Sequence, residues 1–131
     1  MLRVLAYLYY TRRRVLELRA RPSGLKVYSD ASWIAALSIS GGLIFYAGCL
    51  ITWWTRKQKS VSHCSAEAEY YGVVKASSVG LGIRSLFADL DVQLSIDVYT
   101  AASAANGIAH RRGLGRLRRV AVHFLWIQER V

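Results

Sequence analysis

The apolar run GGLIFYAGCLITWW, at residues 41–54, leaves few choices of structure. It is shorter than the roughly 20 residues that a helix needs to cross a membrane. It is rich in Ile, Tyr, Trp and Thr, which favour strands, and Ala47-Gly48 can form a tight connection near its centre. The run therefore predicts an antiparallel hairpin, with strands at 42–46 and 49–55.

The rest of the chain alternates between strand and helix patterns. Strands are expected at 25–33, 42–46, 49–55, 95–100 and 119–122. Helices are expected at 2–19, 65–90, 102–110 and 124–131, with Gly80 and Gly82 dividing the second into two. The resulting order, β-β-β-α-α-β-α-β-α, predicts one α/β domain, a mixed sheet with helices packed on its faces. A length of 131 residues suits a single hydrophobic core.

The charge balance points to a polyanionic partner. The chain has 18 Lys plus Arg and 8 Asp plus Glu, a formal net charge of +10. Such an excess favours nucleic acid, and less often an anionic membrane or an acidic protein. A basic fragment of a larger, balanced assembly is the alternative. The arginine-rich start of the chain fits a mitochondrial presequence and equally an ordinary surface helix, so an intracellular location is expected without a specific compartment. Cys49 and Cys64 lack zinc-site spacing and are expected to be reduced thiols.

Asp30 and one of two glutamates on a predicted helix are candidates for a shared site. Glu67 and Glu69 are about 200° apart around a helix, so they cannot serve the same site. Glu69 shares its stripe with small apolar residues such as Gly72, which predicts that Glu69 points inward and Glu67 toward solvent. Asp30 ends a strand, and an inward Glu69 beside it would make a carboxylate pair of the kind that binds divalent metal. The alternative is that Asp30 only caps a turn.

Four segments carry a resemblance to a known family. LKVYSDASW, the stretch from ITWW to SAEAEYYGVV, VYTAASAANGIA and GLGRLRRVAVHFLWIQERV resemble, in order and spacing, the ribonuclease H domain of copia-type retrotransposon polyproteins. RVLAYLYYTRR resembles the helix that precedes that domain, which divides the chain into 1–24 and 25–131. The resemblance implies a ribonuclease H-like mixed sheet of five strands, the first three antiparallel and then parallel, flanked by helices.

The resemblance also implies Mg²⁺-dependent cleavage of the RNA strand of an RNA–DNA hybrid by four acidic residues. The first two fall on Asp30 and Glu69, which would be the residual catalytic and metal-binding residues. The third and fourth fall on Ala101 and Ala121. Asp97 cannot replace the third, because it lies about 13 Å back along its strand. We therefore expect Mg²⁺ to bind weakly if at all, and hydrolysis to be lost. If the two carboxylates approach without a metal, one should have a raised pKa.

Two basic segments flank this site in the sequence. They are candidate nucleic-acid contacts that would recognise RNA or a hybrid through its backbone: Arg56, Lys57, Lys59, Arg111, Arg112, Arg116, Arg118 and Arg119. A charged loop that only stays in water is the alternative. Three functions are compatible with the sequence: a degenerate ribonuclease H-like domain that still binds nucleic acid, a basic structural subunit of a larger, mitochondrial or other, ribonucleoprotein assembly, and an active ribonuclease H. The four tryptophans could stack on bases, but packing in or near the core is the simpler expectation.

Overall fold

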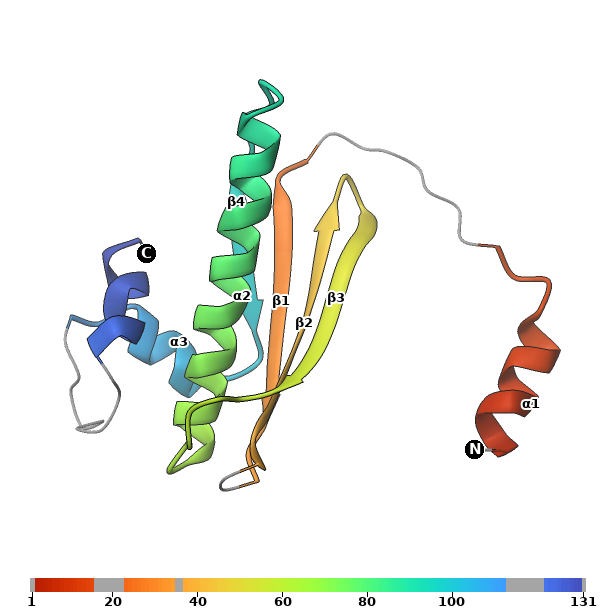
Figure 1. The fold of residues 1–131 in the computed structure, drawn as a ribbon, viewed down its shortest axis with the longest axis horizontal. Coiled ribbons are helices and arrows are strands. Elements are labelled where there is room, and N and C mark those ends of the chain that lie inside the picture. Colours follow the sequence, from red (N-terminus) through yellow and green to blue (C-terminus); the bar gives the residue numbers. More distant parts are fainter. Residues whose placement is uncertain (1, 16–22, 35–36, 113–121, 131) are drawn as a thin grey trace.

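The structure is a computed structural model that describes residues 2–15, 23–34, 37–112 and 122–130. Its centre is a four-stranded mixed sheet in the order β3-β2-β1-β4 (Figure 1). The strands are β1 (Leu25–Ser32), β2 (Ile39–Tyr46), β3 (Cys49–Lys57) and β4 (Ile96–Thr100). The first three are antiparallel, and β4 is parallel to β1. The helices are α1 (Leu2–Thr11), α2 (Ser65–Ala88), α3 (Ser103–Ala109) and the 3₁₀-helix η2 (Val122–Glu129).

The predicted hairpin is confirmed as β2 and β3. Ala47 and Gly48 connect the strands with φ values of 53° and 80°. Two consecutive positive φ values are the geometry of a two-residue hairpin turn whose twist matches that of the strands. The adjacent tryptophans of β3 face opposite sides, as the strand period requires: Trp54 packs on the core, whereas Trp53 is 70% exposed. The apolar run is therefore half core and half surface.

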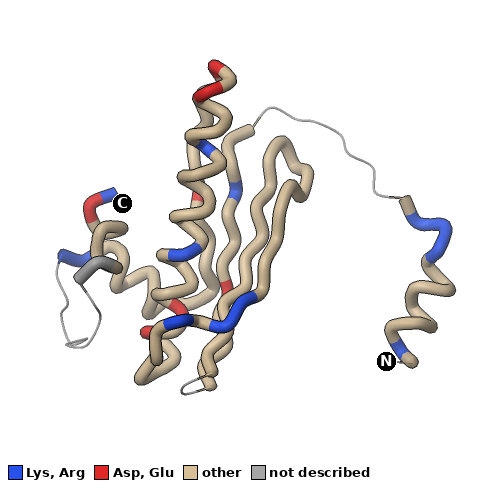
Figure 2. Tube along the Cα trace, viewed as in Figure 1, with Lys and Arg blue, Asp and Glu red and all other residues tan. Residues whose placement is uncertain are grey.

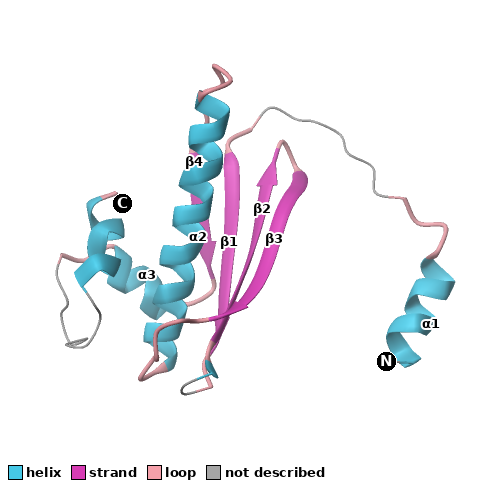
Figure 3. Cartoon of the chain, viewed as in Figure 1, coloured by secondary structure: helices cyan, strands magenta, loops and turns pink. Residues whose placement is uncertain are grey.

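Helix α2 is a single helix of 24 residues, so the predicted division at Gly80 and Gly82 is wrong (Figure 3). Gly80 serves close packing instead, because a Cβ there would lie 2.9 Å from Val27 Cγ2 on β1. A Cβ at Gly82 would meet nothing within 4 Å. The α2 side of the sheet buries the first core cluster: Leu25, Val27, Ile44 and Ala76. Gly80 therefore allows close packing of α2 on the sheet and does not interrupt the helix.

A second layer covers the side of α2 that the sheet does not reach. α3 and η2 pack there, and Figure 1 shows both beside the first half of α2. The Tyr70 hydroxyl donates to the carbonyl of Phe124 in η2 at 2.9 Å, and Tyr71 packs on the Phe124 ring. The start of α2 is therefore enclosed on two sides, which is how Tyr70 comes to be fully buried.

The five-stranded sheet expected from the resemblance is not matched, because the described residues form four strands. The predicted last strand covered 119–122, of which 119–121 lie outside the described residues and Val122 begins η2. Residues 124–131 were expected to form a helix, and η2 covers all but the last two of them. Within the described part of the chain, β4 is consequently an edge strand that pairs with β1 alone.

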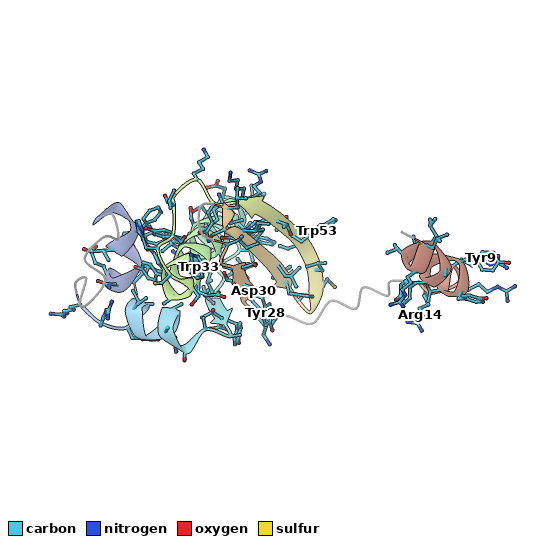
Figure 4. All side chains as sticks on the ribbon, turned by 90° about the horizontal axis from the view of Figure 1, so that it is seen from below. Tyr9, Arg14, Tyr28, Asp30, Trp33 and Trp53 are labelled. Carbon is cyan, nitrogen blue, oxygen red and sulfur yellow. The ribbon has the colours of Figure 1, made fainter. Side chains whose placement is uncertain are left out.

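The opposite face of the sheet carries no helix among the described residues. Its side chains form a row in register across all four strands: Trp53, Leu43, Tyr28 and Tyr99. Tyr28 stacks on Tyr99 with 5.0 Å between ring centroids. Figure 4 shows Tyr28 and Trp53 turned away from α2. Helix α1 ends at Thr11 rather than at residue 19, buries none of its residues and stands apart from the sheet in Figure 1. No described helix combines the length and apolar character needed to cross a membrane.

Candidate functional site

Asp30 and Glu69 come together at one end of the sheet. Asp30 is an exposed residue near the end of β1, where it pairs with Gly41 (Figure 4). Glu69 is half-buried near the start of α2 and accepts a hydrogen bond from the backbone N–H of Ala31. Burial raises the pKa of Glu69, the charge of Asp30 raises it further, and the Ala31 N–H opposes both. The charge of Asp30 therefore disfavours the ionised form of Glu69.

A close helix–strand contact makes this approach possible. A Cβ at Gly72 would lie 3.1 Å from Ser29 Oγ and 3.5 Å from Ala31 Cβ. Because α2 can approach β1 at Gly72, one turn beyond Glu69, the Glu69 carboxylate reaches the backbone of β1. The stripe that contains Glu69 faces the sheet, as its spacing predicts.

Glu67 does not point toward solvent, so that prediction is wrong. Its side chain is 3% exposed. Oε1 accepts a hydrogen bond from the Tyr71 hydroxyl at 2.6 Å, and Oε2 accepts one from the backbone N–H of His63 at 2.8 Å. Burial and then this hydrogen bond to Glu67 raise the pKa of Tyr71. Helical spacing separates the two glutamates, but it does not show that His63 in the preceding loop and Tyr71 one turn later give the Glu67 carboxylate its hydrogen bonds.

Sequence reasoning missed Gln58, which fastens the loop between β3 and α2. Its Nε2 donates to Ser40 Oγ and to the carbonyl of Ala68, both at 2.7 Å, and its Oε1 accepts from Ser62 Oγ at 2.7 Å. Trp33 Nε1 donates to the carbonyl of Ser62 at 2.9 Å. A single loop glutamine carries no periodic signal, so only the contacts reveal that it holds the start of α2 against β2.

A carboxylate at position 101 would lie at the same end of the sheet as Asp30 and Glu69, but the residue there is alanine. Thr100 pairs with Ser29 in the parallel strands β4 and β1. Ala101 comes directly after β4 and Asp30 directly after Ser29, near the end of β1, so both residues lie at the same end of the sheet. The methyl group of alanine offers no oxygen to a metal. Asp97 pairs with Lys26, further from this end of the sheet. Ala121, the other expected position, lies outside the described residues.

The described residues do not fit a bound Mg²⁺ pair. No group of three or more His, Cys, Asp or Glu side chains gathers anywhere in the described ranges. Two metals held for in-line phosphoryl transfer need a larger set of bridging carboxylates than Asp30 and Glu69 provide. The site is a pair of carboxylates at the end of the inner strand β1.

One basic segment lies at the same end of the sheet. Arg56 and Ala31 both pair with Ser40, on its two sides, so two strand spacings of about 4.8 Å separate their backbones. Arg56, Lys57 and Lys59 are exposed. Figure 2 shows this basic segment at the end of β3, toward the start of α2.

The other basic segment is described only in part. Arg111 and Arg112 follow α3, and the charge of Arg111 acts on buried Tyr70 by lowering its pKa against the larger effect of burial. Arg116, Arg118 and Arg119 lie outside the described residues. The structure thus places the first basic segment at the end of the sheet that carries the carboxylates, and it places Arg111 near Tyr70 of α2.

Comparison with known proteins places the chain beside transposon polyproteins. It is 31% identical over 141 residues to the retrovirus-related Pol polyprotein from transposon RE2 and 29% identical over 141 residues to that from transposon RE1, both of Arabidopsis thaliana. Each alignment covers 98% of this chain and 9% of the polyprotein. The chain thus spans less than a tenth of the length of these relatives. These similarities support a retrotransposon-derived α/β domain.

A further similarity involves a smaller protein. The chain is 37% identical over 90 residues to secreted RxLR effector protein 161 of Plasmopara viticola, an alignment that covers 63% of each chain. No protein-family model matches the chain, and no solved structure does.

Proposed function

We propose that this chain is a ribonuclease H-like domain of retroelement origin that has lost hydrolytic activity and binds RNA or RNA–DNA hybrid. The observation that carries the proposal is Ala101, which follows β4 at the end of the sheet where Asp30 lies on β1. The resemblance to ribonuclease H implies an aspartate at position 101. Without it, the described site has two carboxylates, too few to hold two metal ions and the attacking water.

The proposed binding surface is the exposed basic segment at the end of β3. Arg56 and Lys57 lie near the end of the sheet that carries the carboxylate pair, and β2 fixes their register. Such side chains contact phosphates and do not distinguish bases, so the surface would recognise the backbone and shape of the duplex. The formal charge of +10 supports the same partner class.

A cleavage assay tests the loss of activity. Labelled hybrid is incubated with the chain in Mg²⁺ and in Mn²⁺, beside the double variant Ala101→Asp/Ala121→Asp. We expect no cleavage by the unmodified chain, and cleavage by the double variant supports the assignment of the two alanines. Cleavage by the unmodified chain that Asp30→Asn abolishes would show an active enzyme and overturn the proposal.

A salt titration tests the binding surface. The affinity for a hybrid should fall steeply with salt, and Arg56→Ala/Lys57→Ala should reduce the slope of log K against log salt by about one per cation removed. Lys75→Ala removes an exposed charge of α2 and is the matched control. An equal effect of the control would mean that binding is not localised to the end of β3.

A structural role in a larger assembly is the second candidate, and the open face of the sheet favours it. The row from Trp53 to Tyr99 exposes apolar and aromatic side chains across four strands. Exposed patches of this kind mark interaction surfaces. A soluble monomer that binds a hybrid in a salt-dependent manner would exclude an obligate structural subunit.

A further inference from the structure

Trp33 presents an aromatic surface at the end of the sheet where Asp30 lies (Figure 4). It follows Ser32, the last residue of β1, and its side chain is 45% exposed. Its indole Nε1 donates to the carbonyl of Ser62 at 2.9 Å. The one polar atom of the side chain is therefore satisfied within the fold, and the exposed part of the ring is apolar.

The contacts of Ser62 fix the orientation of this ring. Ser62 is 1% exposed, and its hydroxyl donates to Gln58 Oε1 at 2.7 Å. Gln58 is held in turn to Ser40 on β2 and to Ala68 on α2. A strand, a helix and a buried loop residue thus position the indole. An aromatic group that is already held in place loses little conformational entropy on binding.

The same loop carries cations. Lys57 directly precedes Gln58 and is exposed. Lys57 pairs with Ile39, and Ile39 pairs on its other side with Ser32. Two strand spacings of about 4.8 Å therefore separate the backbone of Lys57 from the residue that precedes Trp33. This separation corresponds to about three stacked nucleotides of one strand, so one short stretch of nucleic acid can reach both side chains.

Stacking on the Trp33 ring requires an unpaired base. Bases within a duplex are already stacked on both faces, whereas the unpaired bases of loops and ends can be splayed onto an aromatic side chain. The basic segment contacts phosphates, which paired and unpaired strands share. Trp33 is therefore the feature of this surface that can distinguish the two kinds of strand.

We propose that Trp33 stacks on an unpaired base next to the phosphates that Arg56 and Lys57 contact. The preferred ligand is then an RNA with unpaired nucleotides, such as the single-stranded extension of an RNA–DNA hybrid. This role rests on the proposed binding of nucleic acid, and it specifies which strands are bound. It is independent of base identity, because every base has a face on which an aromatic ring can stack.

The test is a binding titration of the full chain with two hybrids that carry equal numbers of phosphates. Each has about ten base pairs, one helical turn, and an RNA strand extended at both ends by about four nucleotides. The extensions are adenosines in one hybrid and abasic ribose phosphates in the other. We expect about tenfold tighter binding of the first, as for one stacked base, with the same salt slope for both.

The two ways in which this titration can fail are distinguishable. Equal affinities of the two hybrids, both sensitive to salt, would overturn the role of Trp33 and leave the proposed function standing. Failure of both hybrids to bind in a salt-dependent manner would overturn the proposed function as well.

Two substitutions separate stacking from a structural role of the ring. Trp33→Phe and Trp33→Leu both remove the hydrogen bond to Ser62, but only Trp33→Phe keeps an aromatic plane. Trp33→Phe should retain most of the preference for the adenosine extensions. Trp33→Leu should abolish it and leave the affinity for the abasic hybrid unchanged. The full preference in Trp33→Leu, or an equal loss of affinity for both hybrids in both variants, would overturn the inference.

NMR of the complex gives a readout that a structural role would not change. With the adenosine hybrid, the ring protons of Trp33 should shift upfield, because a stacked base places them over its aromatic face. The abasic hybrid should not produce this shift. Trp53, an exposed tryptophan on the side of β3 away from the core, is the matched control and should respond to neither hybrid. Equal shifts of the two tryptophans would indicate nonspecific contact with bases and contradict the proposal.

Discussion

Asp30 on β1 and Glu69 on α2 lie close enough for the charge of Asp30 to raise the pKa of Glu69, second only to the effect of burial. The sign of this effect on stability follows from linkage. The folded chain holds the Glu69 proton to a higher pH than the unfolded chain, whose pKa is near the ordinary 4.5. Stability therefore falls as the pH rises from the unfolded to the folded pKa, and the penalty is complete above the latter.

Asp30→Asn should relieve part of this penalty. The pKa of Glu69, followed by ¹³C NMR of its carboxyl group, should fall but stay above the ordinary value, because burial is the larger cause. The loss of stability above the folded pKa should become smaller in denaturant titrations. Asp97→Asn, at a distant point of the sheet, is the control and should not move the Glu69 titration. An unchanged pKa in Asp30→Asn would mean that the two carboxylates do not interact.

Ala101→Asp should create a site for a divalent cation. The new carboxylate would leave β4 beside Asp30, so three acids would meet at one end of the sheet. Mn²⁺ should then broaden the NMR signals of residues around Ala31 at concentrations that leave the unmodified chain unaffected. Ala104→Asp, exposed on α3, adds the same charge elsewhere. If both variants bind Mn²⁺ alike, the effect is only one of net charge.

Glu67→Ala should destabilise the fold by about 2 kcal/mol, because it leaves the Tyr71 hydroxyl and the His63 N–H without their acceptor. Denaturant unfolding measures the loss. Glu129→Ala, an exposed glutamate of η2, should change stability little. Equal effects of the two would contradict a buried structural role for Glu67.

The two glycines of α2 should respond in opposite directions to alanine. Gly80→Ala should destabilise the chain, because its Cβ would meet Val27 at 2.9 Å on a packed strand. Gly82→Ala has open space and should stabilise the helix by about 1 kcal/mol. Thermal or denaturant unfolding measures both. Stabilisation by both substitutions would mean that α2 does not pack closely at Gly80.

Ser77→Ala should stabilise the free chain by about 1 kcal/mol, since it removes a buried hydroxyl that has no partner among the described residues. Ser78→Ala, exposed on the same helix, is the control. A loss of stability in Ser77→Ala would show that the hydroxyl makes a hydrogen bond in solution.

Local patterns were enough to predict most elements and the inward direction of Glu69. The hairpin at Ala47-Gly48 follows from β-forming residues around a tight turn, and the Glu69 stripe follows from the helical period. Both predictions depend only on residues that are close together in the chain, so they need no information about distant residues.

What only the tertiary structure decided concerns surfaces that meet across long separations. Glu67 is buried and accepts hydrogen bonds from Tyr71 and His63, and Gly80 lies within α2 where a Cβ would meet Val27 of β1. The register of β4 against β1 brings Ala101 beside Asp30, and the four-stranded order leaves the β4 edge open among the described residues. The sequence alone determined most of the elements and the acids of the pair. The approach of Asp30 to Glu69, and the burial of the residues around them, depended on packing between distant segments. Neither segment contains a local pattern that identifies the other.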